Sequence, residues 1–259
     1  MDLTGTTALV TGASRGIGRA IAEELAARPL ELLLCGVRSA DTEPPAAPPG
    51  GAREVRNLTV DLSTRESIEE AAGSLPPLDL LVNNAGLMTG GLLEEQDTDD
   101  IYAMFQVNLV GLVHLTKLVL PGMVERGRGT IVNNASISGY AWFPATTTYA
   151  AAKTGVVAFS ESLRRELRGT GVQVLHLVTP GVDTDMLDDT RRVYGRHMDA
   201  DSWSDMSPQE WAAKVVRAVE HGDHVLGPGG RLALAKLASR GPAALLDAVS
   251  RSLFTREPR

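Results

Sequence analysis

The sequence has almost no cysteine, no long uninterrupted apolar run and no excess of positive charge. Cys35 is the single cysteine among 259 residues, so the chain can form neither an internal disulfide nor a cysteine-built metal site. A chain without disulfides fits a reducing compartment, and we expect a cytoplasmic protein. The formal net charge is −7, whereas binding of nucleic acid needs a basic face. We therefore expect no nucleic-acid partner and no metal.

The most apolar long stretch, Val107–Met123, is interrupted by polar residues and falls short of the roughly 18 to 20 apolar residues that span a bilayer. We predict a buried helix there. The first residues, Met1–Gly5, contain no basic segment, and the first apolar stretch runs directly into a glycine turn. We expect no secretory signal.

Length and composition predict a folded globular chain. It is 43% hydrophobic and 22% charged, near the average of soluble domains, and 259 residues bury enough apolar surface to fold without disulfides or metals. We find neither an internal repeat of solenoid period nor a linker that would divide the chain. The sequence therefore indicates a single domain.

Short apolar runs alternate with longer helical patterns along most of the chain, which is typical of repeated β-α-β units. This alternation predicts an α/β fold, a single-domain doubly wound (Rossmann-type) parallel sheet with helices on both faces. The proline-rich stretch Pro44–Gly51 is predicted as a surface loop, because its prolines lack N–H donors. The predicted strands are Thr7–Val10, Leu30–Gly36, Glu54–Val60, Leu78–Asn83, Gly129–Asn134, Val172–Val178 and His224–Leu226, and the predicted helices are Arg19–Ala27, Ser67–Gly73, Asp99–Leu120 and Thr148–Arg168.

A glycine-rich turn connects the first predicted strand to the first predicted helix. Glycine permits a tight turn and a close approach of backbone to ligand, and the free N–H groups of the helix that follows favour a pyrophosphate. The strand before the turn and the helix after it indicate dinucleotide binding rather than an ordinary turn. The candidate residues are Gly12, Ser14, Arg15, Gly16, Ile17 and Gly18.

Arg38 lies about 20 residues after the turn, where dinucleotide-binding folds place an acidic residue for the ribose or an arginine for a 2′-phosphate. Together with Arg15 it would bind that phosphate through charge-assisted hydrogen bonds. We expect NADP(H) as the preferred cofactor, with NAD(H) as the alternative if both arginines are only solvated surface residues.

These and later motifs resemble the short-chain dehydrogenase/reductase family in its plain, single-domain form, from about Leu3 to Gly230. The glycine turn has the spacing Thr-Gly-x3-Gly-x-Gly, and Ser136, Tyr149 and Lys153 have the spacing Ser-x12-Tyr-x3-Lys. The resemblance implies that further segments contact the cofactor: the adenine at Asp61 and Leu62, the end of the fourth strand at Asn84, Ala85 and Gly86, and the nicotinamide carboxamide at Pro180, Gly181 and Thr184. It also implies catalytic roles for Asn108, Ser136, Tyr149 and Lys153.

The spacing of Tyr149 and Lys153 has a physical basis of its own. Residues four apart on a helix share one face, so the ammonium would lie beside the phenol. A phenol with a pKa of about 10 is a poor base at neutral pH, and a neighbouring positive charge, helped by that of an oxidised nicotinamide, would lower this pKa. We expect Tyr149 to transfer the proton of the reaction and Lys153 to hold the nicotinamide ribose as well.

Ser136 follows the strand Gly129–Asn134, at the sheet edge where open α/β folds bind ligands. Its hydroxyl would donate to the substrate oxygen as negative charge develops there. Ser138 is the alternative, and the count of 13 residues back from Tyr149 favours Ser136. For Asn108 a structural hydrogen bond competes with the role that the resemblance implies, which is to hold a water that links Lys153 to solvent.

The sequence says little about the substrate. Apolar residues after the fourth and fifth strands and after Thr184 would suit a hydrophobic ketone or alcohol, although each of them has a role in packing as the alternative. The segment near 187–207 is predicted as a lid over a small-molecule substrate. The residues concerned are Leu87, Met88, Trp142, Phe143, Met186, Leu187, Val193, Tyr194 and Trp203.

The residues after 230 depart from the family pattern. This stretch, 231–259, has six basic and two acidic side chains, a net charge of +4, and two helical patterns. We predict a C-terminal helical extension of the domain formed by 1–230, packed on its own subunit or on a neighbouring one. A membrane-surface contact is the alternative that we favour least.

The sequence therefore predicts an NADP(H)-dependent oxidoreductase that transfers a hydride between nicotinamide and a secondary alcohol or ketone, in the reductive direction. We expect a homodimer or homotetramer. The alternatives are an epimerase or dehydratase of the same fold and a non-catalytic, cofactor-sensing binder.

Overall fold

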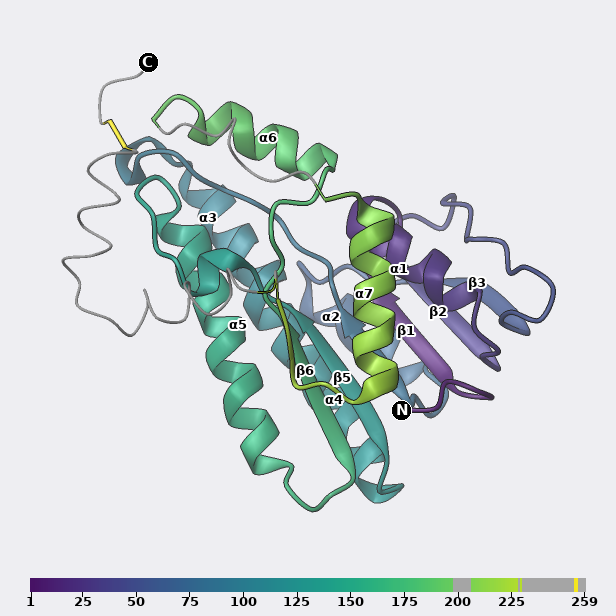
Figure 1. Cartoon of the computed structure of the whole chain (residues 1–259). Coiled ribbons are helices and arrows are strands. Elements are labelled where there is room, and N and C mark those ends of the chain that lie inside the picture. Colours follow the sequence, from purple (N-terminus) through teal and green to yellow (C-terminus); the bar gives the residue numbers. More distant parts are fainter. Residues whose placement is uncertain (198–205, 228, 230–253, 256–259) are drawn as a thin grey trace.

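The computed structural model describes residues 1–197, 206–227, 229 and 254–255 (Figure 1). Its strands form one parallel sheet of seven in the order β3-β2-β1-β4-β5-β6-β7. The predicted fold class is confirmed. The strands are β1 (Thr7–Thr11), β2 (Leu32–Val37), β3 (Glu54–Thr59), β4 (Leu80–Asn83), β5 (Gly129–Asn134), β6 (Val172–Leu177) and β7 (Val225–Leu226).

All seven predicted strands are present, and their ends differ from the prediction by at most two residues. Central strands are buried on both faces, so they consist of continuous apolar runs that are easily found in a sequence. The loop predicted at 44–51 is also present, and it replaces a helix in the crossover from β2 to β3. It lies close to the end of the first helix, since the N–H of Ala52 donates to the carbonyl of Ala26 at 2.9 Å.

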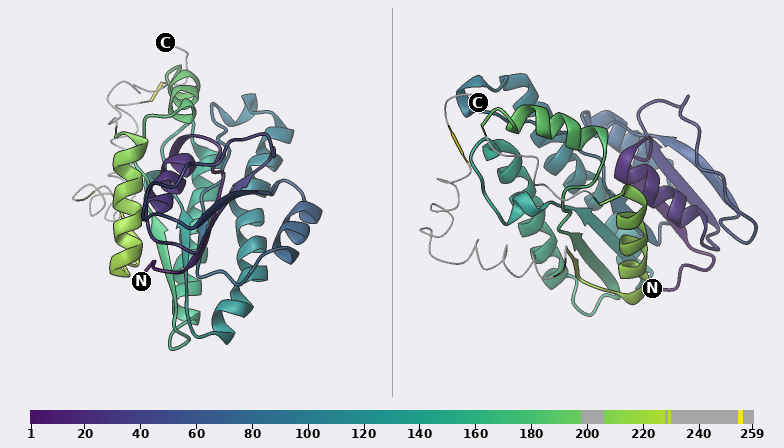
Figure 2. Two further views of the ribbon diagram at one scale, coloured as in Figure 1. Left: turned by 90° about the vertical axis from the view of Figure 1, so that its right-hand side faces the viewer. Right: turned by 45° about the horizontal axis from the view of Figure 1, so that its top comes forward.

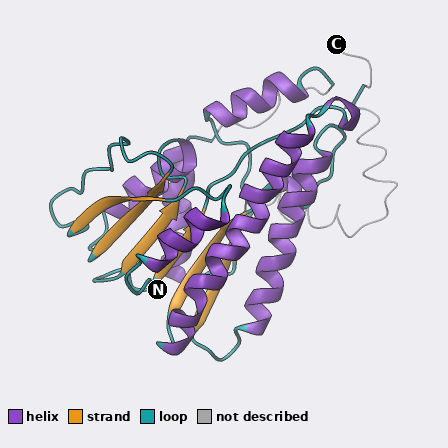
Figure 3. Cartoon of the chain, turned by 180° about the vertical axis from the view of Figure 1, so that it is seen from behind, coloured by secondary structure: helices purple, strands orange, loops and turns teal. Residues whose placement is uncertain are grey.

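Helices cover both faces of the sheet. On one face, Ala8 and Val10 of β1 pack with α1 (Gly16–Ala26) and α7 (Pro208–His221). On the other face, Leu9 packs with α2 (Arg65–Gly73), α4 (Leu112–Glu125) and α5 (Thr147–Glu166). Figure 2 (left) shows α1 and α7 on one side and α2 on the other, and Figure 3 shows the long helices of the second face. Successive side chains of one strand thus enter two different cores.

The helix predicted at Asp99–Leu120 is longer than expected and is not uniform. It consists of α3 (Thr98–Phe105), a π-helical segment η2 (Gln106–Gly111) and α4, which together form 28 residues. By length and composition alone it could cross a membrane, and it is the one such helix among the described residues. In this fold Leu112, Leu115 and Met123 of α4 are buried, so the helix covers the sheet as predicted.

Two helices were not predicted. The first, α6 (Asp185–Tyr194), forms the start of the predicted lid and lies above the carboxyl ends of the strands in Figure 1. The second is α7, whose start is marked by Ser207 and Glu210, because the Ser207 side chain accepts a hydrogen bond from the Glu210 N–H at 3.1 Å. Residue 203 and nearly all of the predicted 231–259 extension lie outside the described residues.

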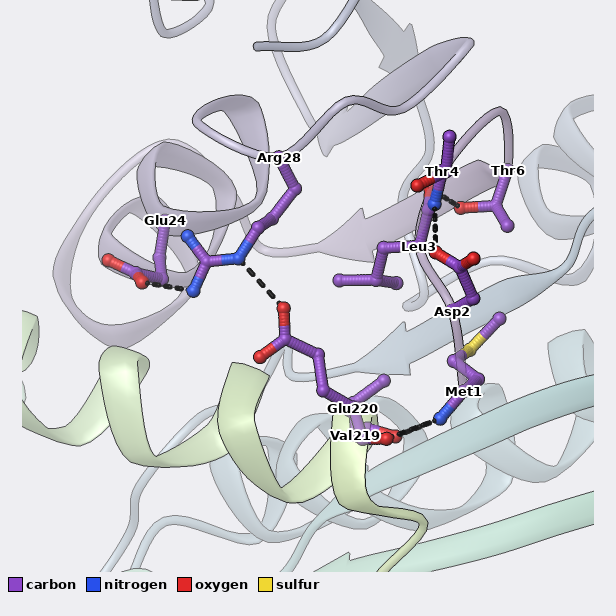
Figure 4. Close-up of polar contacts among 9 residues, drawn as sticks. All are labelled: Met1, Asp2, Leu3, Thr4, Thr6, Glu24, Arg28, Val219 and Glu220. Atoms are coloured by element: carbon purple, nitrogen blue, oxygen red, sulfur yellow. Dashed lines mark hydrogen bonds and ion pairs between the residues drawn. The ribbon is translucent and has the colours of Figure 1, made fainter. Parts of the chain in front are cut away.

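Polar contacts tie α7 to the beginning of the chain (Figure 4). The guanidinium of Arg28 donates to Glu220 on α7 and to Glu24 on α1, both at 2.9 Å. The terminal ammonium of Met1 donates to the carbonyls of Val219 and Glu220 at 2.7 and 2.8 Å. Positive charge at the carboxyl end of a helix is favourable because the last carbonyls are unpaired.

Trp211 on α7 is fully buried in the core between α7 and the sheet. We expect Trp211→Ala to lower the free energy of unfolding by about 3–5 kcal/mol, because it leaves a large cavity. Among the described residues no atom accepts a hydrogen bond from the indole Nε1. Trp211→Phe, which removes that N–H, should therefore cost much less, about 1 kcal/mol. Urea unfolding of both variants checks this, and equal losses would contradict it.

Candidate active site

The polar residues singled out in the sequence meet at the carboxyl edge of the sheet. The order of the strands reverses between β1 and β4, and the glycine turn after β1 lies beside the segment that follows β4. A ligand of an open α/β sheet binds at such a reversal, because the connections leave in opposite directions and open a crevice between them.

The glycine turn is packed so tightly that side chains are excluded. Gly12 has φ +67°, and a Cβ there would lie 2.8 Å from the Cα of Ala85. A Cβ on Gly18 would lie 2.2 Å from the carbonyl oxygen of Gly12. The glycines at these two positions are therefore required by the fold of the turn, apart from any ligand.

The N-terminus of α1 fits a phosphate. Arg15 is its N-cap and has extended backbone, but its side chain makes no capping hydrogen bond, and the first turn contains no acidic residue. By contrast, Thr64, Thr184 and Ser207 cap α2, α6 and α7 with their side chains. The N–H groups of the first turn of α1 and the positive end of its dipole thus suit the pyrophosphate of a dinucleotide. Ser14 is exposed beside them, while Ile17 packs against the core.

The two arginines expected at a 2′-phosphate lie in different surroundings. Arg38 is exposed directly after the last residue of β2. Arg15 is also exposed, and its guanidinium lies 3.4 Å from the carboxylate of Asp185 at the start of α6. An exposed ion pair of this kind is weak, so Arg15 is readily available to another anion.

A buried network of side-chain amides and hydroxyls connects the ends of β1, β4, β5 and β6. The Asn84 amide donates to the Thr11 carbonyl at 3.1 Å and accepts from Asn134 at 2.9 Å, and Thr179 donates to Asn134 at 2.5 Å. The Thr11 hydroxyl accepts from the N–H groups of Asn84 and Ala85. The side chain of Asn84 is therefore occupied by the protein itself, and this segment is held rigidly.

Asn134 and Thr179 were not predicted as site residues, and Thr11 was named only as the first residue of the glycine motif. A signal was present, because an Asn-Asn pair lies at the carboxyl end of both strands: Asn83-Asn84 at β4 and Asn133-Asn134 at β5. Asn83 lies directly opposite Asn133 in the sheet and donates to its side chain at 2.9 Å. The second asparagine of each pair, Asn84 or Asn134, belongs to the hydrogen-bond network at the site.

Tyr149 and Lys153 lie on α5 as the spacing predicts, and the Lys153 Nζ is 5.7 Å from the centre of the Tyr149 ring. Ser136 follows β5, and its hydroxyl lies close enough to the Tyr149 phenol to favour a lower pKa of that phenol. The Ser136 Oγ also accepts from the N–H of Ser138 at 3.1 Å. Ser138, the alternative to Ser136, lies in the short 3₁₀ turn that follows Ser136. Lys153 is buried and donates to the main-chain carbonyl of Asn134 at 2.8 Å.

Burial dominates the protonation of these groups. It raises the pKa of Tyr149 to about 12, although the nearby Ser136 hydroxyl acts in the opposite direction. It lowers the pKa of Lys153 to about 8. From the sequence we expect the charges of Lys153 and of an oxidised nicotinamide together to lower the pKa of Tyr149. In the protein alone the pKa is raised, because loss of solvent destabilises the phenolate. The phenol is therefore held in its protonated form.

Asn108 lies in the π-helical segment η2 and is buried. Its side chain accepts from the N–H of Leu87 and donates to the carbonyl of the same residue, both at 2.7 Å. The structural hydrogen bond considered for Asn108 is thus present. A Cβ on Gly86 would lie 3.1 Å from the Asn108 Oδ1 and 3.8 Å from the Lys153 Nζ, so Asn108 and Lys153 lie on the same side of Gly86.

The remaining predicted cofactor residues lie around the same edge. Asp61 is half-buried and caps the turn after β3 by accepting from the Ser63 N–H at 2.9 Å, while Leu62 is buried in the core. Pro180 and Gly181 follow β6. Thr184 approaches the glycine turn, because a Cβ on Gly16 would lie 3.3 Å from its methyl group. Among the described residues no group of three or more His, Cys, Asp or Glu side chains could hold a metal.

The apolar residues expected at the substrate differ in exposure. Trp142 and Met186 are exposed, Leu187 and Tyr194 are buried, and the others that the structure describes are half-buried. Tyr194 on α6 donates to the carbonyl of Thr89 at 3.2 Å. Burial raises its pKa and Tyr149 raises it further, which indicates that the two phenols are close. The start of the predicted lid therefore lies over the candidate site.

Comparisons with known proteins agree with this arrangement. Residues 6–194 match the family model described as short chain dehydrogenase. The chain is 36% identical over 231 residues to the ketoacyl reductase HetN of Nostoc sp., covering 85% of this chain and 77% of the relative. It is also 36% identical over 225 residues to the 3-oxoacyl-[acyl-carrier-protein] reductase FabG of Vibrio harveyi, covering 83% of this chain and 90% of the relative.

Solved structures are similar over nearly the whole chain. A short chain dehydrogenase from Burkholderia cenocepacia in complex with NADP has a TM-score of 0.78 at 27% identity, covering 98% of this chain and 100% of that one. A short-chain dehydrogenase from Sphingobium yanoikuyae in complex with NADPH has a TM-score of 0.72 at 25% identity, covering 95% and 93%.

The burial of Lys153 predicts an unusual titration. Its ammonium should lose its proton near pH 8, because removal from water disfavours the charged form. NMR of the protein labelled with carbon-13 at the lysine ε position would follow this, and Lys153→Arg, which deletes one resonance, would assign it. Titration of that resonance at the pH of ordinary lysines, above about pH 10, would contradict the prediction.

Proposed function

This chain belongs to the short-chain dehydrogenase/reductase family of NAD(P)-dependent oxidoreductases, and on that basis we propose that it reduces a ketone to a secondary alcohol with NADPH. One observation carries the proposal: the phenol of half-buried Tyr149, whose raised pKa keeps it protonated, lies near the Ser136 hydroxyl and has the Lys153 Nζ 5.7 Å from its ring centre. A cofactor-binding protein without catalytic activity has no need of such a proton donor.

Each part of the site has a separate role in the proposed reaction. The first turn of α1 binds the pyrophosphate of the dinucleotide, which supplies the hydride when it is bound. Tyr149 donates its proton to the carbonyl oxygen of the substrate, and Ser136 donates a hydrogen bond to the same oxygen as it becomes negative. Lys153, held by the Asn134 carbonyl, stabilises the phenolate that remains on Tyr149.

NADP(H) is the preferred cofactor in this proposal, in the reductive direction. Arg38 offers positive charge at the carboxyl end of β2, and no acidic residue adjoins it in Val37-Arg38-Ser39. Two of the similar solved structures are complexes with NADP and NADPH.

The proposed substrate class is a 3-oxoacyl thioester. The relatives named as ketoacyl and 3-oxoacyl reductases support this choice. The half-buried apolar side chains of Leu87, Met88 and Phe143, in the loops after β4 and β5, suit the acyl chain. The predicted homodimer or homotetramer and the cytoplasmic location stay predictions.

A panel of carbonyl compounds tests this function directly. NADPH oxidation is followed by its absorbance with a 3-oxoacyl thioester of coenzyme A, a simple ketone, a steroid ketone and a sugar. We expect the thioester to give the highest kcat/KM. A thioester rate no higher than that of the other compounds would contradict the substrate class, and no oxidation with any carbonyl would contradict the reductase activity.

Tyr149→Phe tests the proton donor. The variant should lower kcat by about 10²–10⁴-fold, because only the transferable proton is lost. Its affinity for NADPH, measured by quenching of intrinsic fluorescence, should stay within a few-fold of the wild type. Tyr102→Phe on the exposed surface of α3 is the matched control. Unchanged turnover in Tyr149→Phe would refute the mechanism.

Arg38→Asp tests the cofactor preference. An aspartate repels the 2′-phosphate and accepts hydrogen bonds from ribose hydroxyls, so the ratio of kcat/KM for NADPH to that for NADH should fall by at least about ten-fold. Arg53→Asp is the control, since Arg53 is also exposed but lies directly before β3, at the amino ends of the strands. A ratio that responds equally to both substitutions would exclude a phosphate contact at Arg38.

A further inference from the structure

A second polar cluster lies behind the turn that carries Ser136, and the proposed reaction does not use it. The Tyr140 hydroxyl and the His176 Nε2 of β6 are 2.9 Å apart, and the two rings stack with centres 6.3 Å apart. The His176 Nδ1 lies 3.7 Å from a carboxylate oxygen of Glu161 on α5. Tyr140 and His176 are only 7% and 1% exposed, so the pair is sealed inside the protein.

The charge on Glu161 favours one direction for the hydrogen bond between Tyr140 and His176. Arg164 and Arg165 lie 3.1 and 2.7 Å from this carboxylate. Burial tends to raise the pKa of Glu161, but the hydrogen bond from Arg164 and the charges of Arg164, His176 and Arg165 together hold the pKa below its usual range. In a neutral imidazole, an ionised carboxylate facing Nδ1 favours the proton on that nitrogen. The Nε2 is then an acceptor, and the Tyr140 hydroxyl donates to it.

Tyr140 is joined to Ser136 by a single tight turn, η3 (Ile137–Gly139). The N–H of Gly139 donates to the Ser136 carbonyl and that of Tyr140 to the Ile137 carbonyl, both at 2.9 Å. These two hydrogen bonds hold Tyr140 in a fixed position relative to Ser136. A displacement of Tyr140 would therefore also displace Ser136.

The same turn is enclosed between β6 and the helix of the proton donor. The N–H of Ile137 donates to the carbonyl of Thr179 after β6 at 3.0 Å. On the other side a Cβ on Gly139 would lie 3.0 Å from the carbonyl of Lys153 on α5. The depth at which the turn lies between these elements sets the distance from the Ser136 hydroxyl to the Tyr149 phenol.

We propose that Tyr140 and His176 are positioning residues for Ser136: their buried hydrogen bond fixes the turn between β6 and α5 and thereby the place from which the Ser136 hydroxyl meets the reacting oxygen. The inference rests on the proposed function, since its effect is measured through Ser136. Tyr140 and His176 themselves contact neither substrate nor cofactor in this proposal.

A double-mutant cycle tests the inference with NADPH and the best carbonyl substrate of the panel. Ser136→Ala should lower kcat by about 10²-fold. Tyr140→Phe should lower kcat by about ten-fold in the protein that has Ser136, and by less than about two-fold in Ser136→Ala, because residues that act through one group are not additive. The KM for NADPH should stay within about two-fold in each protein, because the turn η3 is separate from the glycine turn.

Two variants of His176 separate positioning from general stability. His176→Phe keeps a ring but no acceptor and should behave like Tyr140→Phe, whereas His176→Gln offers an amide oxygen to the Tyr140 hydroxyl and should recover part of the lost kcat. Cooperative thermal unfolding of each variant shows that it is folded, and Tyr102→Phe repeats the loss of a phenolic oxygen on the surface.

The outcomes are distinct. A loss of kcat on Tyr140→Phe that is the same with Ser136 present and in the Ser136→Ala protein, or no loss at all in Tyr140→Phe, overturns the inference and leaves the proposed function in place. Equal turnover of wild type and Ser136→Ala overturns the proposed role of Ser136, and the inference with it.

Discussion

The hydrogen bond from the Lys153 Nζ to the main-chain carbonyl of Asn134 is the contact on which the site depends. It holds a cation in a buried position beside Tyr149, where burial has already lowered the pKa of the lysine to about 8. A single neutral acceptor compensates only part of the desolvation of an ammonium. This hydrogen bond cannot be lost without leaving the ammonium buried and unpaired, so the strand end that supplies the Asn134 carbonyl must be rigid. The side-chain network of Asn84, Asn134 and Thr179 provides that rigidity by joining three strands at their carboxyl ends.

The site combines two opposite electrostatic demands. The N-terminus of α1 attracts negative charge and is left without a capping side chain, whereas the phenol on α5 is kept protonated by burial. A reductase needs both, since the dinucleotide is anionic and the developing alkoxide must receive a proton. The fold brings both to one edge of the sheet, because α1 follows β1, α5 follows β5, and only β4 separates these two strands.

Much of this arrangement could be predicted from the sequence. Central strands are apolar runs, and a glycine turn between strand and helix or a tyrosine four residues before a lysine is a local pattern, so these were found. The helices α6 and α7 were missed, although Ser207 and Glu210 carried a capping signal. The raised pKa that Tyr149 has in the protein alone was not predicted, because a sequence shows the neighbouring charge but not the loss of solvent.

The sequence alone determined the fold class, the family and the residues that form the turn, the helix faces and the strand ends, since these depend on periodicity and on neighbours within a few positions. Only the tertiary structure decided which residues meet across strands: Asn84 with Asn134, Lys153 with the Asn134 carbonyl, and Tyr140 with His176. The two residues of each pair lie 50, 19 and 36 positions apart along the chain, and in each pair they belong to different strands, helices or loops. No local pattern specifies them, because register, burial and the loss of water are properties of the assembled sheet.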